Sequence, residues 1–450
     1  MSSESSRGSL IAALFVYNLI LLVTLPFLVM FIVWNLIITD KSRGGMGERL
    51  GFVPVRGDDS TPRVWLHAVS VGEAVAAKPI WERLLEKLPG WQMVYSVTTD
   101  TGYEHARRLV NGRGQVIYFP FDFLLCMGLA LARVRPRLVV LVETELWPNF
   151  LALAKLMGCK VLMVNGRISD RSLVGSARLG PLYRWMTANI DRYCMQSQED
   201  ADRIIQIGAD PARVVVVGNS KFDQTNPEVS LGEQITLRNA LGLQREERVL
   251  LAGSTHAGEE EVVLRAFRQV KTAYPDVRLI IAPRDLHRAQ EIEELVIAHG
   301  FTAVRRTKLS GAPATPDAVL ILDTIGELSR AYALCTASFV GGSLVSIGGH
   351  NVLEPIALGK PALFGPHMHN FRDIAAIVQQ AGVGVQVNDA DALAANWQRY
   401  LADPALCQSV TDQTAAVFRQ HQGASLRCAM EASRLLETPV HPEGVEAQRG

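Results

Sequence analysis

Short apolar segments alternate with longer amphipathic ones along most of this chain, and this alternation limits the folds open to it. Between residues 64 and 217 the short segments are rich in Val, Ile and Leu, and a stretch with helical spacing follows most of them. Short buried strands separated by helices form parallel sheets with helices on both faces. We therefore expect strands at Val64–Ala68, Met93–Thr98, Val116–Phe119, Leu138–Glu143, Val161–Asn165, Arg192–Gln196 and Val214–Val217.

The alternation stops at the polar stretch FDQTNPEVSLGE, residues 222–233, which is typical of a linker, and then starts again. Helices are expected at Glu259–Lys271 and Leu286–His299. Further strands are expected at Val249–Ala252, Leu279–Ala282, Ala303–Arg305, Ala318–Leu322, Ser338–Gly341, Pro361–Phe364 and Val383–Val387. The pattern predicts an α/β fold of two successive doubly wound, Rossmann-like domains, which face a cleft with the carboxyl edges of their strands.

The length of 450 residues agrees with this division into domains. We expect a first domain over residues 41–224, a second over 225–436 whose last helices pack back on the first, and a flexible tail over 437–450. The charges balance, with 45 basic and 45 acidic residues, which argues against bulk electrostatic binding of nucleic acid. Six widely spaced cysteines without a CxxC pair indicate reduced, buried thiols.

The N-terminus carries no charged residue from Gly8 to Thr39, and Leu10–Ile38 is mostly Leu, Ile, Val and Phe. About 20 apolar residues suffice to span a bilayer. The run is too long for a signal peptide and lacks an A-x-A cleavage site. Lys41, Arg43 and Arg49 follow it, which by the positive-inside rule places the rest of the chain in the cytoplasm. We expect a membrane anchor over residues 1–40, spanning the bilayer or lying in one leaflet.

Polar, glycine-bearing clusters follow the expected strands one after another. The clusters of the first half are SVGE (70–73), TTDTG (98–102), ETELWPN (143–149), NGRIS (165–169) and GNSKFD (218–223). A purely structural α/β protein needs turns there, but not charged side chains at turn after turn. Because ligands bind at this edge of a parallel sheet, the concentration indicates a functional site.

Individual residues of these clusters allow two interpretations. Glu73 falls in the first turn of a helix, where an acid opposes the helix dipole whether or not it has a catalytic role. Gly348 and Gly349 precede a helix expected to begin near Asn351, a place that favours phosphate, with Glu354 one turn inside and able to bind ribose hydroxyls. Arg284 fits phosphate or carboxylate, and equally a surface ion pair.

Metal ligation is not expected. The histidines at 256, 350, 367 and 369 match no common zinc spacing, and no carboxylate cluster accompanies them.

Eight motifs in this order closely resemble those of the 3-deoxy-D-manno-octulosonic acid (Kdo) transferases of lipopolysaccharide synthesis, from the N-terminus to about residue 380. The motifs are HAVSVGE, ETELWPN, NGRIS, KFD, STHAGEEE, GEL, GGSLVSIGGHNVLEP and GPHMHNF. Gly166 departs from an expected alanine, and Ser220, before Lys221, replaces an often apolar residue. The resemblance implies a GT-B glycosyltransferase without cofactor that transfers Kdo from CMP-Kdo to a lipid A precursor (lipid IVA) at the cytoplasmic face of the inner membrane.

The resemblance also assigns roles. It implies that Glu73 is the catalytic base and that Glu143 and Lys221 stabilise the transition state. The segments that it implies for CMP binding are Pro283–Arg284, Gly326–Glu327–Leu328 and Asn351–Val352–Leu353–Glu354. Glu143 has a structural alternative, an ion pair with Arg167. Two rivals remain for the whole chain: another membrane-associated GT-B transferase or epimerase that uses a UDP-sugar, and a binding protein that keeps the fold without catalysis.

Overall fold

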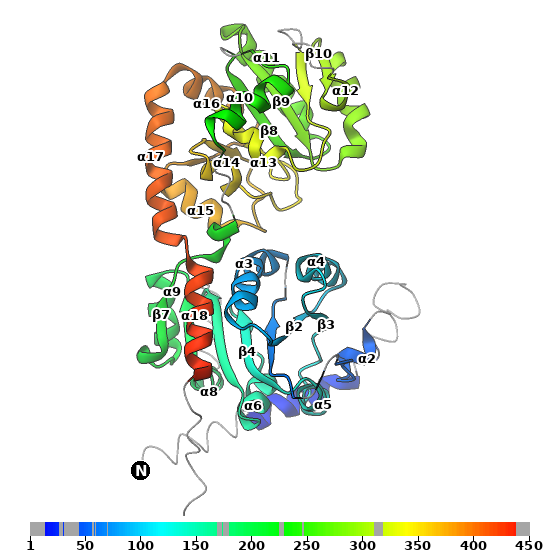
Figure 1. The fold of residues 1–450 in the computed structure, drawn as a ribbon, viewed down its shortest axis with the longest axis vertical. Coiled ribbons are helices and arrows are strands. Elements are labelled where there is room, and N and C mark those ends of the chain that lie inside the picture. The colour runs from blue at the N-terminus through cyan, green and yellow to red at the C-terminus, as the bar shows by residue number, and fades with distance from the viewer. Residues whose placement is uncertain are drawn as a thin grey trace, which may run out of the picture. The chain divides into compact units, whose positions relative to one another are not determined.

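The computed structural model describes residues 14–26, 45–55, 60–69, 71–168, 180–224, 229–244, 247–309 and 318–437, with the single residues 30, 58 and 173. These residues form two compact units (Figure 1). The first comprises residues 1–224 and 421–450, and the second comprises residues 225–420. The chain thus leaves the first unit near residue 224 and returns to it near residue 421.

The first unit is built on a seven-stranded, wholly parallel sheet in the order β3-β2-β1-β4-β5-β6-β7. Every strand lies within two residues of its expected position. The strands are β1 (Arg63–His67), β2 (Gln92–Val97), β3 (Gln115–Tyr118), β4 (Pro136–Val142), β5 (Lys160–Gly166), β6 (Arg192–Met195) and β7 (Val214–Val216).

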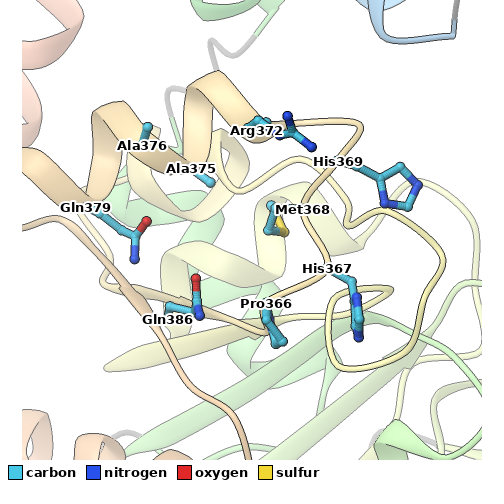
Figure 2. A pocket seen from close by; sticks show the side chains of 9 residues that line it. All are labelled: Pro366, His367, Met368, His369, Arg372, Ala375, Ala376, Gln379 and Gln386. Carbon is cyan, nitrogen blue, oxygen red and sulfur yellow. The ribbon is translucent and has the colours of Figure 1, made fainter.

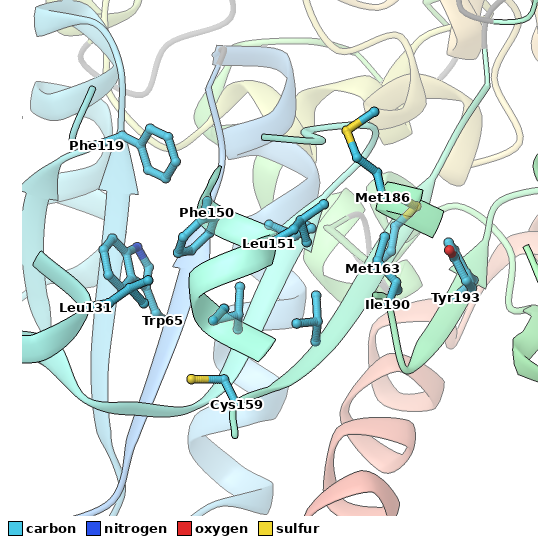
Figure 3. Packing of buried hydrophobic residues seen from close by; sticks show 14 of the residues in the cluster. Trp65, Phe119, Leu131, Phe150, Leu151, Cys159, Met163, Met186, Ile190 and Tyr193 are labelled. Carbon is cyan, nitrogen blue, oxygen red and sulfur yellow. The ribbon is translucent and has the colours of Figure 1, made fainter. Parts of the chain in front are cut away.

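Both faces of this sheet are buried, which is why its strands are continuous apolar runs rather than alternating ones. Successive side chains point to opposite faces, so Trp65 and Val139 enter one core while Leu66 and Val140 enter the other. Figure 3 shows the first core, where Trp65 packs on Phe150 with ring centroids 5.0 Å apart. Full burial of such side chains is worth about 1.5–3 kcal/mol each.

Helices cover both faces of the sheet, and their ends agree with local capping. Thr99 caps α4 and Ser197 caps α9 by accepting a backbone N–H three residues on. The last helix, α18, places Cys428 and Ala432 in the second core. The helices of this unit are α2 (Met46–Arg49), α3 (Val71–Lys87), α4 (Asp100–Val110), α5 (Leu124–Val134), α6 (Pro148–Leu156), α8 (Gly180–Ala188), α9 (Gln198–Ile207) and α18 (Ala424–Glu437).

The second unit repeats the plan with a parallel sheet in the order β10-β11-β9-β8-β12-β13-β14. Its strands are β8 (Val249–Thr255), β9 (Arg278–Pro283), β10 (Thr302–Arg305), β11 (Ala318–Ile321), β12 (Ala337–Val340), β13 (Ala362–Phe364) and β14 (Gly384–Gln386). Its helices are α10 (Leu231–Ala240), α11 (Glu259–Ala273), α12 (Ala289–Ala298), α13 (Leu328–Ala331), α14 (Leu353–Ala357), α15 (Arg372–Gln380), α16 (Ala390–Ala402) and α17 (Pro404–His421).

Two local expectations were wrong, and the helix expected over Leu286–His299 is confirmed with a different first turn. The polar stretch 222–233 is not all linker, because a 3₁₀ turn covers Ser220–Gln224 and a capping box between Ser230 and Glu233 starts α10. The helix expected from Leu286 is a 3₁₀ turn followed by α12. The helix expected near Asn351 is α14, which begins at Leu353 and has five residues, so Glu354 is its second residue and not a turn inside.

Residues 14–26 are helical, and the rest of the expected anchor lies largely outside the described residues. Two polar side chains hold this segment to the first unit. The Tyr17 hydroxyl donates to Asp122 at 2.9 Å, and the Asn18 amide donates to Asn149 at 2.9 Å. Its exposed apolar side chains are Phe15, Val16, Leu19, Ile20, Leu22 and Val23. No helix within the described ranges is both long and apolar enough to cross a bilayer.

Candidate active site

In both units the strand order reverses next to the first strand, and this geometry selects the loops that form a site. In the first unit β1 lies between β2 and β4, and in the second β8 lies between β9 and β12. Loops that leave such neighbouring strands in opposite directions open a crevice at the carboxyl edge of the sheet. The loops concerned follow β1 and β4 in the first unit, and β8 and β12 in the second.

Glu73 lies at the crevice of the first unit, as the third residue of α3, and its side chain is buried. One carboxylate oxygen accepts the backbone N–H of Val69 at 2.7 Å, which closes the turn between β1 and α3. Burial is the main cause that raises the pKa of the neighbouring Tyr95, and the charge of Glu73 adds to it. This hydrogen bond holds Glu73 at the edge of the sheet, and it stabilises the turn whether or not Glu73 has a catalytic role.

Glu143 and Lys221 come together although 78 residues separate them. Lys221 Nζ lies 3.3 Å from Glu143 Oε1, and the side chains keep only 6% and 19% of their exposure. Glu143 follows β4 with φ at 58°, a left-handed conformation that is uncommon outside glycine and marks a constrained position. The ion pair of Glu143 is thus with Lys221, while the Thr144 hydroxyl donates to the backbone carbonyl of Arg167.

A buried polar network that the sequence did not single out supports this pair. Asn165 accepts the Ser220 N–H at 3.0 Å, and the Gln196 amide donates to the Asn165 carbonyl at 2.9 Å. Asn219 donates to Gln196 at 2.8 Å, and the Ser220 hydroxyl donates to the Ala76 carbonyl of α3 at 2.9 Å. The network ties the loop that carries Lys221 to the helix that carries Glu73. The polar Ser220, noted above as a departure, supplies this link.

Gly166, the other departure, has a packing reason. A Cβ added there would lie 2.5 Å from the Met195 sulfur and 3.2 Å from the Met163 sulfur. The neighbouring methionines thus fill the space that an alanine methyl would need.

In the second unit, the segments expected to bind CMP follow β11, β9 and β12, where β11 and β9 are neighbours and β8 separates β9 from β12. Pro283 ends β9, and the exposed Arg284 follows it, with its N–H bound to the Thr255 carbonyl at 3.0 Å. Burial raises the pKa of Glu354, and the positive charge of Arg284 partly opposes this rise. Arg284 and Glu354 therefore lie close enough to act on one ligand.

Other members of these segments have structural roles. Asn351 accepts the Leu353 N–H at 3.1 Å and so starts α14, while the side chains of Val352 and Leu353 are buried, leaving only their backbone for a ligand. Gly326 is exposed with φ at 87°. Glu327 forms a 3.2 Å ion pair with Arg306, and Leu328 opens α13. The helix α14 has only five residues, so it has no long helix dipole. A dipole therefore does not support the phosphate site that the sequence predicted at the start of this helix.

Two histidines whose partnership the sequence did not reveal occupy the crevice of the second unit. His256 Nε2 and His350 Nε2 lie 2.8 Å apart, and the rings are parallel to within 4°. They follow β8 and β12, the two strands of the switch point. Their separation by 94 residues hid the pairing, and the only sequence signal was that each lies in a polar segment that follows an expected strand.

The GPHMHNF motif lines a hollow of about 380 Å³ in the second unit. Figure 2 shows His367 and His369 on the loop after β13, Arg372 at the start of α15, and Gln379 and Gln386 on the other side. Asn370 joins this loop to the glycine-rich one through its N–H, which donates to the Gly348 carbonyl at 3.0 Å. Within the described part of the chain, no three His, Cys, Asp or Glu side chains gather in a way that would hold a metal ion.

The comparisons with known proteins agree with these features. The family model for 3-deoxy-D-manno-octulosonic-acid transferase (kdotransferase) matches residues 44–224. The chain is 35% identical over 373 residues to the 3-deoxy-D-manno-octulosonic acid transferase of Bordetella pertussis, covering 81% of this chain and 85% of that protein. It is 30% identical to the enzyme of the same name from Haemophilus influenzae, over 84% of this chain and 88% of that one.

Other similarities extend over different lengths. The chain is 35% identical to a bifunctional glycosyltransferase/methyltransferase of Fusobacterium nucleatum, and it spans about half of that protein, 51%. A putative UDP-N-acetylglucosamine 2-epimerase from Listeria monocytogenes shares the fold with a TM-score of 0.52 at 12% identity, over 86% of this chain and 100% of that one. This likeness concerns the fold of two parallel-sheet domains and not the substrate. The chain belongs to the 3-deoxy-D-manno-octulosonic acid transferase family and is a glycosyltransferase.

Proposed function

We propose that this enzyme transfers Kdo from CMP-Kdo to a lipid A precursor, lipid IVA, with inversion at the anomeric carbon. The observation that carries the proposal is the convergence of Glu73, Glu143 and Lys221 on the carboxyl edge of one sheet, at its switch point. An inverting transfer needs a base that takes the proton of the acceptor hydroxyl as the hydroxyl attacks. It also needs fixed charges near the centre where the sugar becomes oxocarbenium-like.

Glu73 is the base in this proposal. The Glu73 carboxylate accepts the Val69 N–H at 2.7 Å, and this hydrogen bond fixes the direction of the carboxylate. Glu143 faces the positive charge that develops on the sugar, and Lys221 Nζ lies 3.3 Å from Glu143 Oε1 and holds this side chain in place. Each charge is thus in position before the reaction, so little reorganisation is needed during it.

The donor is bound by the second unit in this proposal. Arg284 offers a planar fork to the phosphate of CMP, and Glu354 accepts from ribose hydroxyls. The leaving group carries one phosphate, whose charge Arg284 and loop amides neutralise without a metal ion. We therefore expect no cofactor, and we expect transfer to continue in excess EDTA, whereas inhibition by EDTA that Mg²⁺ reverses would contradict this view.

The site of action proposed is the cytoplasmic face of the inner membrane. The exposed apolar side chains of residues 14–26 provide contact with lipid. Arg49 is engaged within the first unit, because its guanidinium donates to the Thr98 carbonyl at 2.8 Å. The phosphorylated lipid acceptor lies in the same membrane. A protein held there meets its acceptor by diffusion in two dimensions.

The test of the catalytic assignment is Glu73→Gln in the full chain. The amide keeps the shape but cannot take the proton, and loss of a general base lowers turnover by about 10²–10⁴-fold. Binding of CMP should be unchanged. The matched control is Glu86→Gln on the exposed side of the same helix, where the carboxylate pairs with Arg83. Turnover of Glu73→Gln close to that of the control would exclude Glu73 as the base.

The donor is tested separately by competition. CMP should inhibit the transfer of Kdo and UDP should not, with the product masses read by mass spectrometry. Inhibition by UDP alone would favour the rival transferase or epimerase that uses a UDP-sugar.

A further inference from the structure

The last helix of the chain, α18, belongs to the first unit although it follows the whole second unit in sequence (Figure 1). It contacts the 3₁₀ turn Ser220–Gln224, which carries all three residues of the KFD motif. The proposed function uses only the lysine of this motif. The contacts of the other two residues, Phe222 and Asp223, show what they do.

The Asp223 carboxylate binds the start of α18, 202 residues further along the chain. One oxygen accepts the Gly423 N–H at 2.5 Å, and the other accepts the Ser425 N–H at 2.7 Å and the Ser425 hydroxyl at 2.6 Å. The first N–H groups of a helix have no partner inside the helix, and the helix dipole favours a negative charge there. Both oxygens of Asp223 are thus engaged, and the carboxylate cannot turn away without losing hydrogen bonds.

Two further contacts join the same part of the chain to the C-terminal helices. The fully buried Phe222 ring stacks on His421, the last residue of α17, with centroids 4.6 Å apart and planes 20° apart. The Arg427 guanidinium, from the first turn of α18, donates to the Val217 carbonyl at 3.0 Å, directly after β7. The turn and the segment that leads into it are therefore both fixed to these helices.

Lys221 lies between two fixed points of its own backbone. Before it, the Ser220 hydroxyl donates to the Ala76 carbonyl of α3 at 2.9 Å. After it, Asp223 is bound to α18. Lysine has a flexible four-carbon stem, so its amine keeps one place only where the backbone and the surrounding groups hold it. In this structure Lys221 Nζ lies 3.3 Å from Glu143 Oε1, and the lysine side chain keeps only 6% of its exposure.

We propose that Asp223 is a positioning residue for Lys221, and that α18 acts through Asp223 to hold the Lys221 amine beside Glu143. This rests on the transition-state role proposed above for Lys221, and it gives the C-terminal helix a part in the reaction. Asp223 acts on the backbone of the turn and not on the substrate. Loss of its hydrogen bonds to α18 releases the turn, and a misplacement of about 1 Å at a reacting centre can lower a rate about 10²-fold.

The first measurement is the steady-state kinetics of Kdo transfer by the full-length protein in detergent, with CMP titration beside it. Asp223→Asn should lower kcat by up to about 10²-fold, because the amide turns N–H donors toward the N–H groups of α18. The Kd of CMP should stay at the wild-type value, since the second unit binds the donor. Ser425→Ala removes only the hydroxyl contact and should lower kcat less.

The control is Asp191→Asn at the amino edge of the same sheet. Asp191 also accepts a backbone N–H, that of Val161 at 2.7 Å, but it precedes β6 and lies at the edge opposite to the site. Urea unfolding of each variant shows that the protein is folded under the assay conditions. The control should lose stability and keep the wild-type kcat.

A double-mutant cycle separates positioning from a general loss of structure. In the Lys221→Met background, Asp223→Asn should have little further effect on kcat, because the side chain that it positions is absent. Where Asp223→Asn does not fold, Ser425→Ala takes its place in every comparison. A loss by the same factor in both backgrounds, or wild-type turnover of the single variant, would overturn the proposal. Full turnover of Lys221→Met would instead refute the proposed role of Lys221, and the positioning with it.

Discussion

Single residues in this enzyme acquire their properties from groups far away in the chain. Lys221 is nearly buried, and its partner Glu143 comes from a loop 78 residues earlier and lies 3.3 Å from it. A buried ion pair is costly to break from one side, since the remaining charge is left without a partner. The residue-scale predictions concern charges of this kind.

Lys221→Met should lower kcat by at least about 10²-fold and leave the Kd of CMP unchanged, because Lys221 belongs to the first unit. Arg284→Ala should have the opposite signature, with a higher Kd for CMP. Steady-state kinetics and CMP titration distinguish the two.

The double variant Lys221→Met with Glu143→Gln should lose less transition-state stabilisation than the sum of the two single variants. The difference should be about 0.5–3 kcal/mol of coupling free energy. Strictly additive losses would mean that the pair does not act as a unit.

His67 should make the first unit sensitive to acid. Burial lowers its pKa from 6.5 to about 3. Below pH 6.5 the unfolded chain therefore binds a proton that the folded chain refuses, so stability is complete above pH 6.5 and falls by up to about 1.4 kcal/mol per unit down to pH 3. His67→Phe keeps the stacking on Phe119, whose centroid is 3.8 Å away.

Urea unfolding of wild type and His67→Phe at several pH values between 4 and 7 measures this difference. The free energy of unfolding of the variant should depend less steeply on pH. Parallel pH curves for the two proteins would show that His67 does not carry the acid sensitivity.

At the scale of elements, the loops are held by a few buried acceptors rather than by regular structure. α14 is a single turn, so the loop from Gly341 to Asn351 depends on other contacts for its shape. Glu259, at the first turn of α11, provides them by accepting four backbone N–H groups. A buried carboxylate with every lone pair engaged is hard to replace.

Glu259→Gln should therefore destabilise the second unit by about 2–4 kcal/mol and weaken CMP binding, because the amide turns two N–H donors toward N–H groups. Glu261→Gln is the control, since Glu261 lies in the same first turn but is exposed. Its effect should stay within about 0.5 kcal/mol. The measurements are chemical denaturation and CMP titration. Equal behaviour of the two variants would refute the role given to Glu259.

At the scale of the whole molecule, the apolar N-terminus and the two sheets have separate tasks. Residues 14–26 touch the first unit through Tyr17 and Asn18 and expose their apolar side chains. The segment is therefore attached to the same unit that carries Glu73. This arrangement keeps the base at a fixed place relative to the proposed membrane surface.

Deletion of residues 1–38 should yield a protein that binds CMP like the full chain but acts poorly on acceptor embedded in a membrane. Fractionation after a high-salt wash, CMP titration, and assays with acceptor in vesicles and in detergent measure the three properties. Tyr17→Phe with Asn18→Ala is the companion variant, which removes the polar contacts and keeps the apolar run. A truncated protein that stays in the membrane pellet with full activity would contradict the proposed role of the N-terminus.

The sequence by itself determined the architecture, since all fourteen strands lie within three residues of their expected ends. Burial of both sheet faces makes parallel strands continuous apolar runs, a signal that survives in local sequence. It also placed Glu73, Glu143, Lys221 and Arg284 at carboxyl edges. The prediction was wrong for short elements such as α14, because a single helical turn is too short to show a periodic pattern of apolar residues.

Only the tertiary structure decided which of these residues meet. Lys221 pairs with Glu143, His256 faces His350, and the Glu259 carboxylate joins two loops more than 80 residues apart. Such contacts depend on strand order, and strand order places loops side by side that the chain keeps far apart. The local sequence does not encode the strand order. A helix that connects two parallel strands has the same apolar pattern whichever side of the first strand the second one joins.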